Sequence, residues 1–109
     1  MFGSFAQVVE SHHKYAQDWK AKTGKKVVGS FCTYVPEEII YAADILPVRV
    51  MGGHNPEDLS APYIPNMYCA FCRDVLSEAI RGNYDYLDGI VKARCCYHIR
   101  QAFSSWVQY

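Results

Sequence analysis

The chain has 109 residues, half of them hydrophobic, and its eleven basic side chains balance eleven acidic ones. This length predicts one small domain. The neutral balance excludes the strongly basic surface of a nucleic-acid or anionic-membrane binder. No apolar run approaches the ~20 residues of a membrane span, and no leader-like segment opens the chain, so we expect a cytoplasmic protein. Its five cysteines are then expected as thiols or metal ligands rather than disulfides.

Residues 1–24 carry apolar side chains at helical spacing, which predicts a leading amphipathic helix that ends near Thr23 and Gly24. His12 and His13 lie on this helix. We interpret them as a boundary and a surface histidine rather than as a pair of metal ligands.

Residues 25–109 alternate strand-like and helix-like segments and form the α/β portion of the chain. Strands are predicted at Lys25–Phe31, Leu46–Met51 and Tyr86–Lys92, helices at Glu37–Ala43, Tyr68–Arg81 and Cys96–Tyr109, and a long loop at Gly52–Asn66. This order predicts a parallel sheet with helices on both faces, a three-layer α/β/α arrangement. Pro47 near the start of its strand favours an edge position. Three strands make a thin parallel sheet, so we expect an incomplete part of a larger subunit.

Cys32 follows the first predicted strand, a few residues before Pro36, Glu37 and Glu38 open a helix. Proline is well tolerated at the start of a helix, and carboxylates suit the positive end of its dipole. A thiol is therefore expected at the carboxyl edge of the sheet. In open α/β sheets that edge is where ligands bind, and a helix N-terminus favours a thiolate.

Cys96 stands in the corresponding turn, between the third strand and the last helix. In a parallel sheet the two turns share one edge, so Cys32 and Cys96 can converge there. Spacing alone gives equal weight to this convergence and to the alternative that the two thiols are unrelated. Four side chains add positive charge around Cys96 and favour a thiolate or a bound anion: Lys92, Arg94, His98 and Arg100.

Cys69 and Cys72 form a Cys-x-x-Cys pair, a spacing that suits a zinc site or a redox dithiol. A zinc ribbon needs a second such pair, which the Cys95-Cys96 doublet is not. Both thiols fall on the apolar face of the predicted helix, where cysteine behaves as a small hydrophobe. We therefore favour packing. His54, in the long loop, is interpreted as a solvated histidine rather than as a proton donor.

Three segments resemble the iron–sulfur subunits of the benzoyl-CoA reductase / 2-hydroxyacyl-CoA dehydratase family. They are FCTYVPEEIIYAADILPVRVMGGHNPEDL, MYCAFCRDVLSEAIRGNYDYLDGIV and CCYHIRQAFSSW, and the resemblance covers Lys25 to Trp106. The motifs Cys-x-Tyr-x-Pro-Glu-Glu, Leu-Asp-Gly-Ile-Val and Cys-x-x-Ile-Arg stand in the family's order. The segments PVRVMGGH and MYCAFCRDVL look closer to the benzoyl-CoA reductase branch than to the dehydratases.

The resemblance implies an N-terminal, flavodoxin-like portion of a catalytic subunit and a [4Fe–4S] cluster held by three cysteines. The first ligand falls on Cys32 and the second on Cys96, with Cys95 as the register alternative; the third is expected in a C-terminal domain. The implied partners are an acyl-CoA substrate such as benzoyl-CoA, a homologous second catalytic subunit and an ATP-hydrolysing iron–sulfur electron donor. Asp44 departs from the glycine that relatives tend to carry after the helix.

Overall fold

The structure, a computed structural model, describes residues 2–109 and contains a three-stranded parallel sheet with five helices around it. The strands are β1 (Val27–Ser30), β2 (Leu46–Arg49) and β3 (Gly89–Val91). β1 is central and pairs in parallel with both neighbours, in the order β2-β1-β3. The predicted α/β class and parallel sheet are confirmed, and Pro47 lies on an edge strand as expected.

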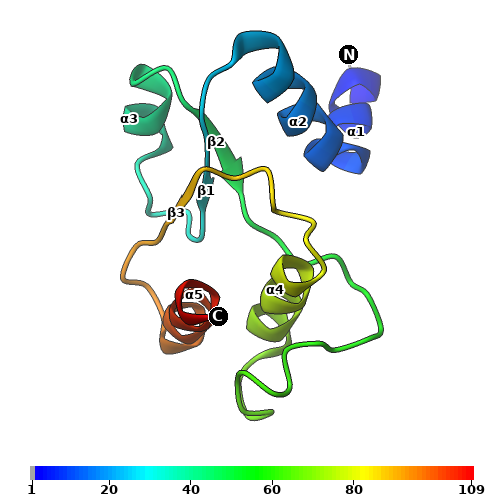
Figure 1. Ribbon diagram of the computed structural model, residues 1–109, viewed down its shortest axis with the longest axis vertical. Helices are drawn as coiled ribbons and strands as arrows, with labels where there is room; N and C mark the ends of the chain where they lie inside the picture. The colour runs from blue at the N-terminus through cyan, green and yellow to red at the C-terminus, as the bar shows by residue number, and fades with distance from the viewer. Residues whose placement is uncertain (1) are drawn as a thin grey trace.

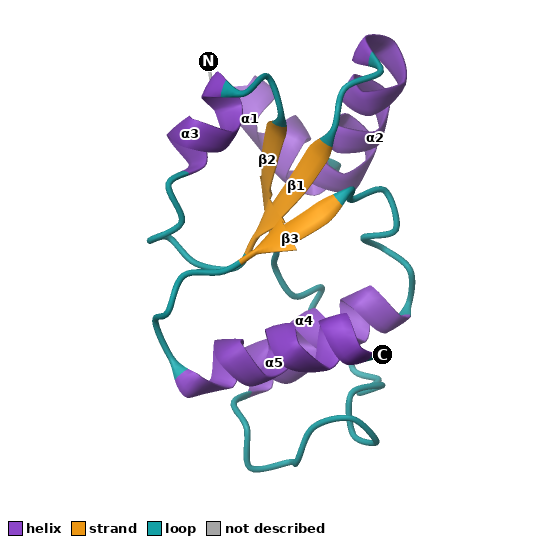
Figure 2. Cartoon of the chain, turned by 60° about the vertical axis from the view of Figure 1, so that its left-hand side comes forward, coloured by secondary structure: helices purple, strands orange, loops and turns teal. Residues whose placement is uncertain are grey.

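The helices are α1 (Phe2–Glu10), α2 (His12–Thr23), α3 (Glu37–Ala42), α4 (Ala70–Ile80) and α5 (Tyr97–Gln108). Figure 1 and Figure 2 show α2 and α3 flanking the sheet on opposite sides, while α4 and α5 lie side by side beyond it. Among the described residues, no helix is long and apolar enough to cross a membrane.

The leading segment differs from its prediction, because it forms two helices instead of one. The break is at Ser11, whose backbone leaves the helical region and whose hydroxyl donates to the Gln7 carbonyl at 2.7 Å. A serine that bonds back to the preceding turn weakens a helix locally. The predicted end is confirmed: Gly24 adopts φ +65° and its N–H closes the last turn on the Lys20 carbonyl.

The turn between α3 and β2 contains a residue other than glycine with a left-handed backbone conformation. Asp44 has φ +65°, in the left-handed region that favours glycine. Aspartate is among the few other residues that adopt it, because its short polar side chain bonds locally. Here the Asp44 carboxylate also pairs with Lys25 at the entry to β1. Aspartate is therefore compatible with the backbone that glycine would adopt in this turn.

The hydrophobic core joins the sheet to α2, α4 and α5. Phe31 follows β1 directly, is 2% exposed, and meets the rings of Phe103 and Trp106 edge-on at 5.6 and 5.4 Å. Edge-to-face ring pairs stabilise beyond the area they bury. Other buried members of the core include Ala16, Val27, Val50, Cys72, Val75, Tyr84, Ile99 and Ala102. Because α5 packs on Phe31, the turn that precedes α5 lies next to the turn that follows β1.

Candidate functional site

The carboxyl ends of β1 and β3 bring the turns that carry Cys32 and Cys95-Cys96 together. β1 and β3 are neighbouring parallel strands, and the Phe31 N–H donates to the Val91 carbonyl at 3.0 Å just beyond their ladder. Cys32 then begins a tight turn in which its carbonyl accepts from the Val35 N–H. Parallel pairing thus places these turns at one edge. We call Cys32, Cys95 and Cys96 the thiol edge.

Cys32 and Cys95 influence each other's ionisation at this edge. The Cys95 thiol donates a hydrogen bond to the Cys32 sulfur, and this is the main reason why the pKa of Cys32 is lowered. The backbone N–H of Tyr34 and the charge of Arg49 act in the same direction, and burial opposes them. The same hydrogen bond raises the pKa of Cys95. Cys32, which is 9% exposed, therefore carries the favoured thiolate of this edge.

Cys96, the residue predicted to converge with Cys32, has a different local role. It is the N-cap of α5, and its sulfur accepts from the Ile99 N–H at 3.4 Å. Cys95, the register alternative, is the doublet member that contacts Cys32. Both cysteines of the doublet are exposed. A choice between adjacent residues depends on the path of the β3–α5 turn, which spacing in the sequence does not encode.

The Cys-x-x-Cys pair lies beside the thiol edge. Cys72 is completely buried, as the packing interpretation predicted, but Cys69 is exposed at the N-cap of α4, so that prediction was wrong for Cys69. The Cys69 N–H donates to His98 Nδ1 at 2.7 Å, which ties the start of α4 to the first turn of α5. Burial is the main cause that raises the pKa of Cys72, followed by Cys69 and then by Cys96 and Cys95. The sequence did not predict that Cys72 lies near the Cys95-Cys96 doublet, because this arrangement arises from the packing of α4 against α5.

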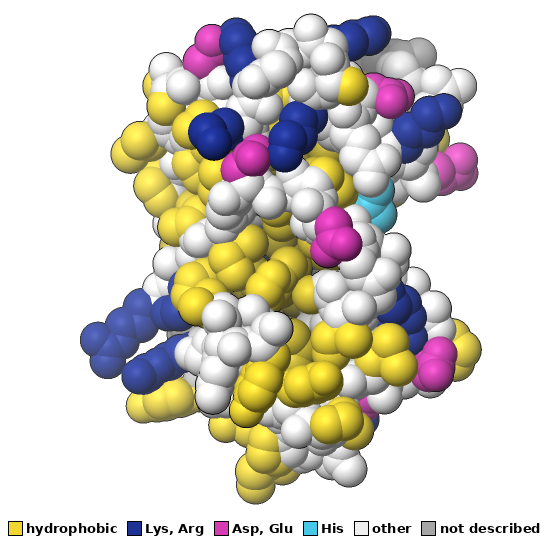
Figure 3. Space-filling model, viewed as in Figure 1, with side chains coloured by type: hydrophobic (Ala, Val, Ile, Leu, Met, Phe, Trp, Pro, Cys, Tyr) yellow, Lys and Arg dark blue, Asp and Glu magenta, His cyan; other side chains and the backbone are white. Residues whose placement is uncertain are grey.

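Positive charge gathers at the thiol edge without carboxylate partners. Arg94 and Arg100 line a hollow of about 210 Å³ together with the Cys95-Cys96 doublet and Tyr97. Within residues 2–109, no carboxylate forms an ion pair with Arg94, Arg100 or Lys92. Figure 3 shows Lys and Arg side chains projecting from the side of the molecule where the β3–α5 turn runs. This surface suits an anionic group.

The thiol edge supplies only part of a metal-binding set. Soft thiolates are the ligands that iron–sulfur clusters use. Cys32 with one cysteine of the doublet fits two positions of such a set. Across residues 2–109, however, no three histidine, cysteine, aspartate or glutamate side chains are grouped so as to hold a metal ion. His12 and His13, which are adjacent in α2, contact aromatic rings. The His13 ring packs on Tyr84 and Tyr86.

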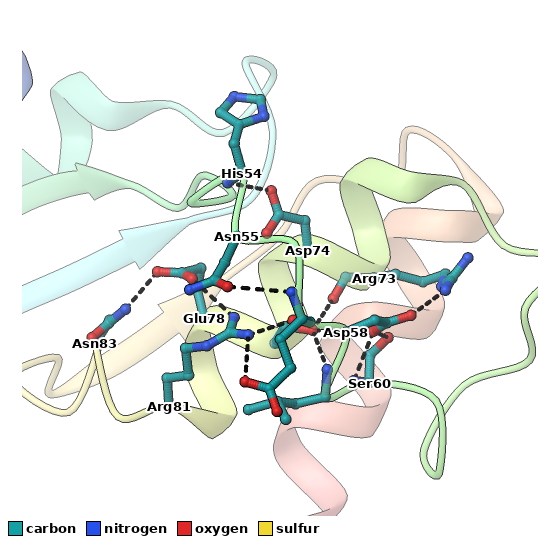
Figure 4. Close-up of polar contacts among 12 residues, drawn as sticks. His54, Asn55, Asp58, Ser60, Arg73, Asp74, Glu78, Arg81 and Asn83 are labelled. Carbon is teal, nitrogen blue, oxygen red and sulfur yellow. Dashed lines mark hydrogen bonds and ion pairs between the residues drawn. The ribbon is translucent and has the colours of Figure 1, made fainter.

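A second hollow lies between the long loop and α4, with a volume of about 440 Å³. Figure 4 shows how polar contacts hold this loop: the His54 N–H donates to Asp74, and Asp58 pairs with Arg73. The His54 side chain is exposed, as expected for a loop histidine. The Asp58 and Arg73 charges satisfy each other. Glu57 and Asp74 also line this hollow, so its lining carries more acidic than basic side chains.

Asp58 gives this loop a pH-dependent attachment. The Ser60 hydroxyl is the main cause that lowers the pKa of Asp58 to about 2, and Arg73 adds to it. A depressed pKa stabilises the fold above the unfolded value of about 3.9, and that contribution is lost as pH falls through about 2. We expect Asp58→Asn to cost about 1 kcal/mol at pH 7, a value discounted for solvent screening of the partly exposed pair. The difference from wild type in urea unfolding should shrink between pH 4 and 2. A difference that stays constant down to pH 2 would contradict this assignment.

The fold and the thiol edge together define an α/β protein with a thiol-lined, positively charged site at the carboxyl ends of its strands. Residues 32–109 match the family model described as 2-hydroxyglutaryl-CoA dehydratase, D-component. The chain belongs to this family, which confirms the resemblance seen in its motifs.

Its curated relatives are named as subunits of enzymes. The (R)-phenyllactyl-CoA dehydratase beta subunit of Clostridium sporogenes is 33% identical over 87% of this chain and 25% of its own length. The (R)-2-hydroxyglutaryl-CoA dehydratase beta subunit of Acidaminococcus fermentans is 34% identical over 88% of this chain and 25% of its own. A benzoyl-CoA reductase subunit of Thauera aromatica is 30% identical over 84% and 24%. The chain thus spans about a quarter of the length of these relatives.

Proposed function

We propose that this chain is the N-terminal part of a catalytic subunit that passes single electrons to an acyl-CoA thioester through a [4Fe–4S] cluster. Cys32 supplies one ligand and the Cys95-Cys96 doublet a second, with Cys96 as the family's position and Cys95 as the alternative. The observation that carries the proposal is the parallel pairing of β1 with β3, which brings the turn with Cys32 and the turn with the Cys95-Cys96 doublet to one edge of the sheet. Family membership supports the same chemistry.

The residues around the edge have separable tasks in this proposal. The hydrogen bond from Cys95 and the charge of Arg49 favour the Cys32 thiolate, the form that binds metal. Arg94 and Arg100 offset the negative charge of thiolates and cluster, and nearby charge is one of the means by which proteins tune cluster potentials. When bound, the cluster supplies low-potential one-electron transfer, and the protein supplies binding and electrostatics. A third ligand then comes from a C-terminal domain.

The specific reaction that we propose is reduction of the aromatic ring of benzoyl-CoA, with 2-hydroxyacyl-CoA dehydration as the alternative. The resemblance of the segments PVRVMGGH and MYCAFCRDVL to the benzoyl-CoA reductase branch supports ring reduction. Relatives from both branches lie between 30% and 34% identity, which supports the shared class. The proposed complex contains a homologous second subunit and an ATP-hydrolysing iron–sulfur donor. Five free cysteines, none in a disulfide, fit a cytoplasmic location.

The test of the cluster is anaerobic iron–sulfide reconstitution of the complete subunit, read by iron content and by the electron paramagnetic resonance of the reduced protein. We expect Cys32→Ser to abolish the cluster, because serine removes a thiolate ligand. Cys95→Ser and Cys96→Ser, measured separately, identify the second ligand by which one loses the signal. Cys69→Ser is the control and should retain the cluster. A full cluster in Cys32→Ser would overturn the assignment.

Substrate and cofactor class are tested on the same preparation. With the electron donor and ATP, consumption of benzoyl-CoA supports the reductase, and consumption of a 2-hydroxyacyl-CoA supports the dehydratase. The competing hypothesis is a non-catalytic zinc or thiol-redox module at Cys69 and Cys72. Zinc without iron in the purified protein would favour that module over the catalytic subunit.

A further inference from the structure

The helix α1 presents an apolar stripe that no other part of residues 2–109 covers. Its members Phe2, Phe5 and Val9 are 82%, 65% and 72% exposed. No residue of α1 is buried, and the helix packs chiefly on α2 (Figure 1). By contrast, α2 buries Ala16 in the hydrophobic core. The apolar side of α1 is therefore left open by the fold of the described residues.

The spacing of these three side chains suits contact with another helix. Steps of three and then four residues place them in line on one face, which is the a-d-a spacing of a coiled-coil seam. The helix is interrupted at Ser11, so the stripe ends with α1 and is not continued by α2. A helix of nine residues is also marginal by itself, because isolated helices shorter than about 12–15 residues are barely stable in water. A second helix on the stripe therefore stabilises α1.

The charges of α1 indicate which occupant fits the stripe. Glu10 is its only charged residue, and it contains no lysine or arginine. A helix that lies on an anionic membrane surface carries such basic side chains on its polar face, so α1 lacks that character. A second α1 helix fits better. Two antiparallel copies align their dipoles favourably, and each Glu10 then lies toward the positive, N-terminal end of the other helix.

We propose that α1 is a self-association surface, on which α1 of a second copy of this chain packs in antiparallel orientation. The contact has twofold symmetry, so the same stripe is used by both copies. Phe2 of one copy then faces Val9 of the other, and the two Phe5 side chains meet at the centre.

The area of the stripe predicts a weak dimer. A whole aromatic side chain buries about 150–250 Å², so the exposed parts of the apolar side chains of α1 amount to roughly 450 Å² per copy. These side chains are Phe2, Phe5, Val8 and Val9. Two copies bury roughly 900 Å², less than the ~1,200 Å² at which stable complexes begin. We therefore expect a dissociation constant on the order of 10–100 µM.

This surface lies outside the part of the chain that carries the proposed cluster function. The family model matches residues 32–109, whereas α1 ends at Glu10. Self-association through α1 therefore goes beyond that function, and its test needs neither iron nor substrate.

Sedimentation equilibrium of the metal-free chain, over concentrations from about 5 to 300 µM, measures the association. Dithiothreitol keeps the five cysteines reduced, so that no disulfide-linked dimer contributes. We expect a reversible monomer–dimer equilibrium in wild type. Phe5→Glu should raise the dissociation constant at least about tenfold, because it removes apolar area and places a carboxylate at the centre of the contact. Phe5 is largely exposed in the single chain, so this variant should still fold.

Gln7→Glu is the matched control, because it adds the same carboxylate to the same helix on the face away from the stripe. Gln7 is exposed, and this change should leave the dissociation constant within about twofold of wild type. Circular dichroism checks that both variants are folded.

A chain that remains monomeric over the whole concentration range overturns the proposal. A dimer that Phe5→Glu leaves intact, or that Gln7→Glu weakens equally, does the same, since the contact would then lie elsewhere. Binding of a monomeric chain to vesicles of phosphatidylcholine and phosphatidylserine would also overturn it, because the stripe would then serve a membrane. None of these results bears on the cluster proposal, whose test reads iron bound in the complete subunit.

Discussion

Phe31→Ala is expected to destabilise the chain by about 3–5 kcal/mol, the largest effect of any single truncation we predict. Phe31 is 2% exposed, and its ring meets those of Phe103 and Trp106 of α5 edge-on. Truncation removes the apolar area and both ring contacts, and it leaves a cavity between β1 and α5. Because small domains are stable by only about 5–15 kcal/mol, this is a large share of the total.

Urea unfolding followed by circular dichroism measures the loss, and Phe71→Ala is the matched control. Phe71 is also a phenylalanine but is 44% exposed on α4, so its truncation should change stability by no more than about 0.5 kcal/mol. Equal losses in the two variants would show that Phe31 does not hold α5 to the sheet. Tryptophan fluorescence gives a second readout, since Trp106 contacts Phe31 directly.

Gly29→Ala should destabilise the chain by about 1–3 kcal/mol, although strand propensity alone predicts a small gain. Gly29 lies in the central strand β1. A Cβ atom there would stand 2.8 Å from both Leu87 Cδ1 and Val50 Cγ2. Val50 is buried in the core and has little room to turn away, so the added methyl forces strain on the sheet.

Gly89→Ala in β3 is the control for Gly29→Ala, because it makes the same change in the same sheet. The nearest atom to a Cβ at position 89 is Val28 Cγ2 at 4.0 Å, an ordinary contact. This variant should therefore be neutral or slightly more stable in urea. If Gly29→Ala also proves neutral, the close approach of β1 to Leu87 and Val50 is not a real constraint.

Pattern and turn chemistry were enough to locate most elements. The carboxylates after Pro36 begin α3 where expected, Gly24 ends α2, and Pro47 falls on an edge strand. The third strand is shorter than its predicted range and begins at Gly89. Tyr86, the first residue of the predicted range, instead lies in the turn before the strand, where its hydroxyl bonds to His13. This contact depends on how α2 packs, which the local pattern does not encode.

By itself the sequence determined the α/β class, the parallel sheet and the edge at which thiols gather. Hydrophobic periodicity and capping residues are local properties, so they can be recognised from residues close together in the sequence. Tertiary structure alone decided which sulfurs meet. It placed Cys95 against Cys32 and left Cys96 as the cap of α5. It also exposed Cys69 while burying Cys72 only three residues away. The reason is physical: a side chain's neighbours depend on how strands and helices pack, and a shift of one residue in a turn changes them.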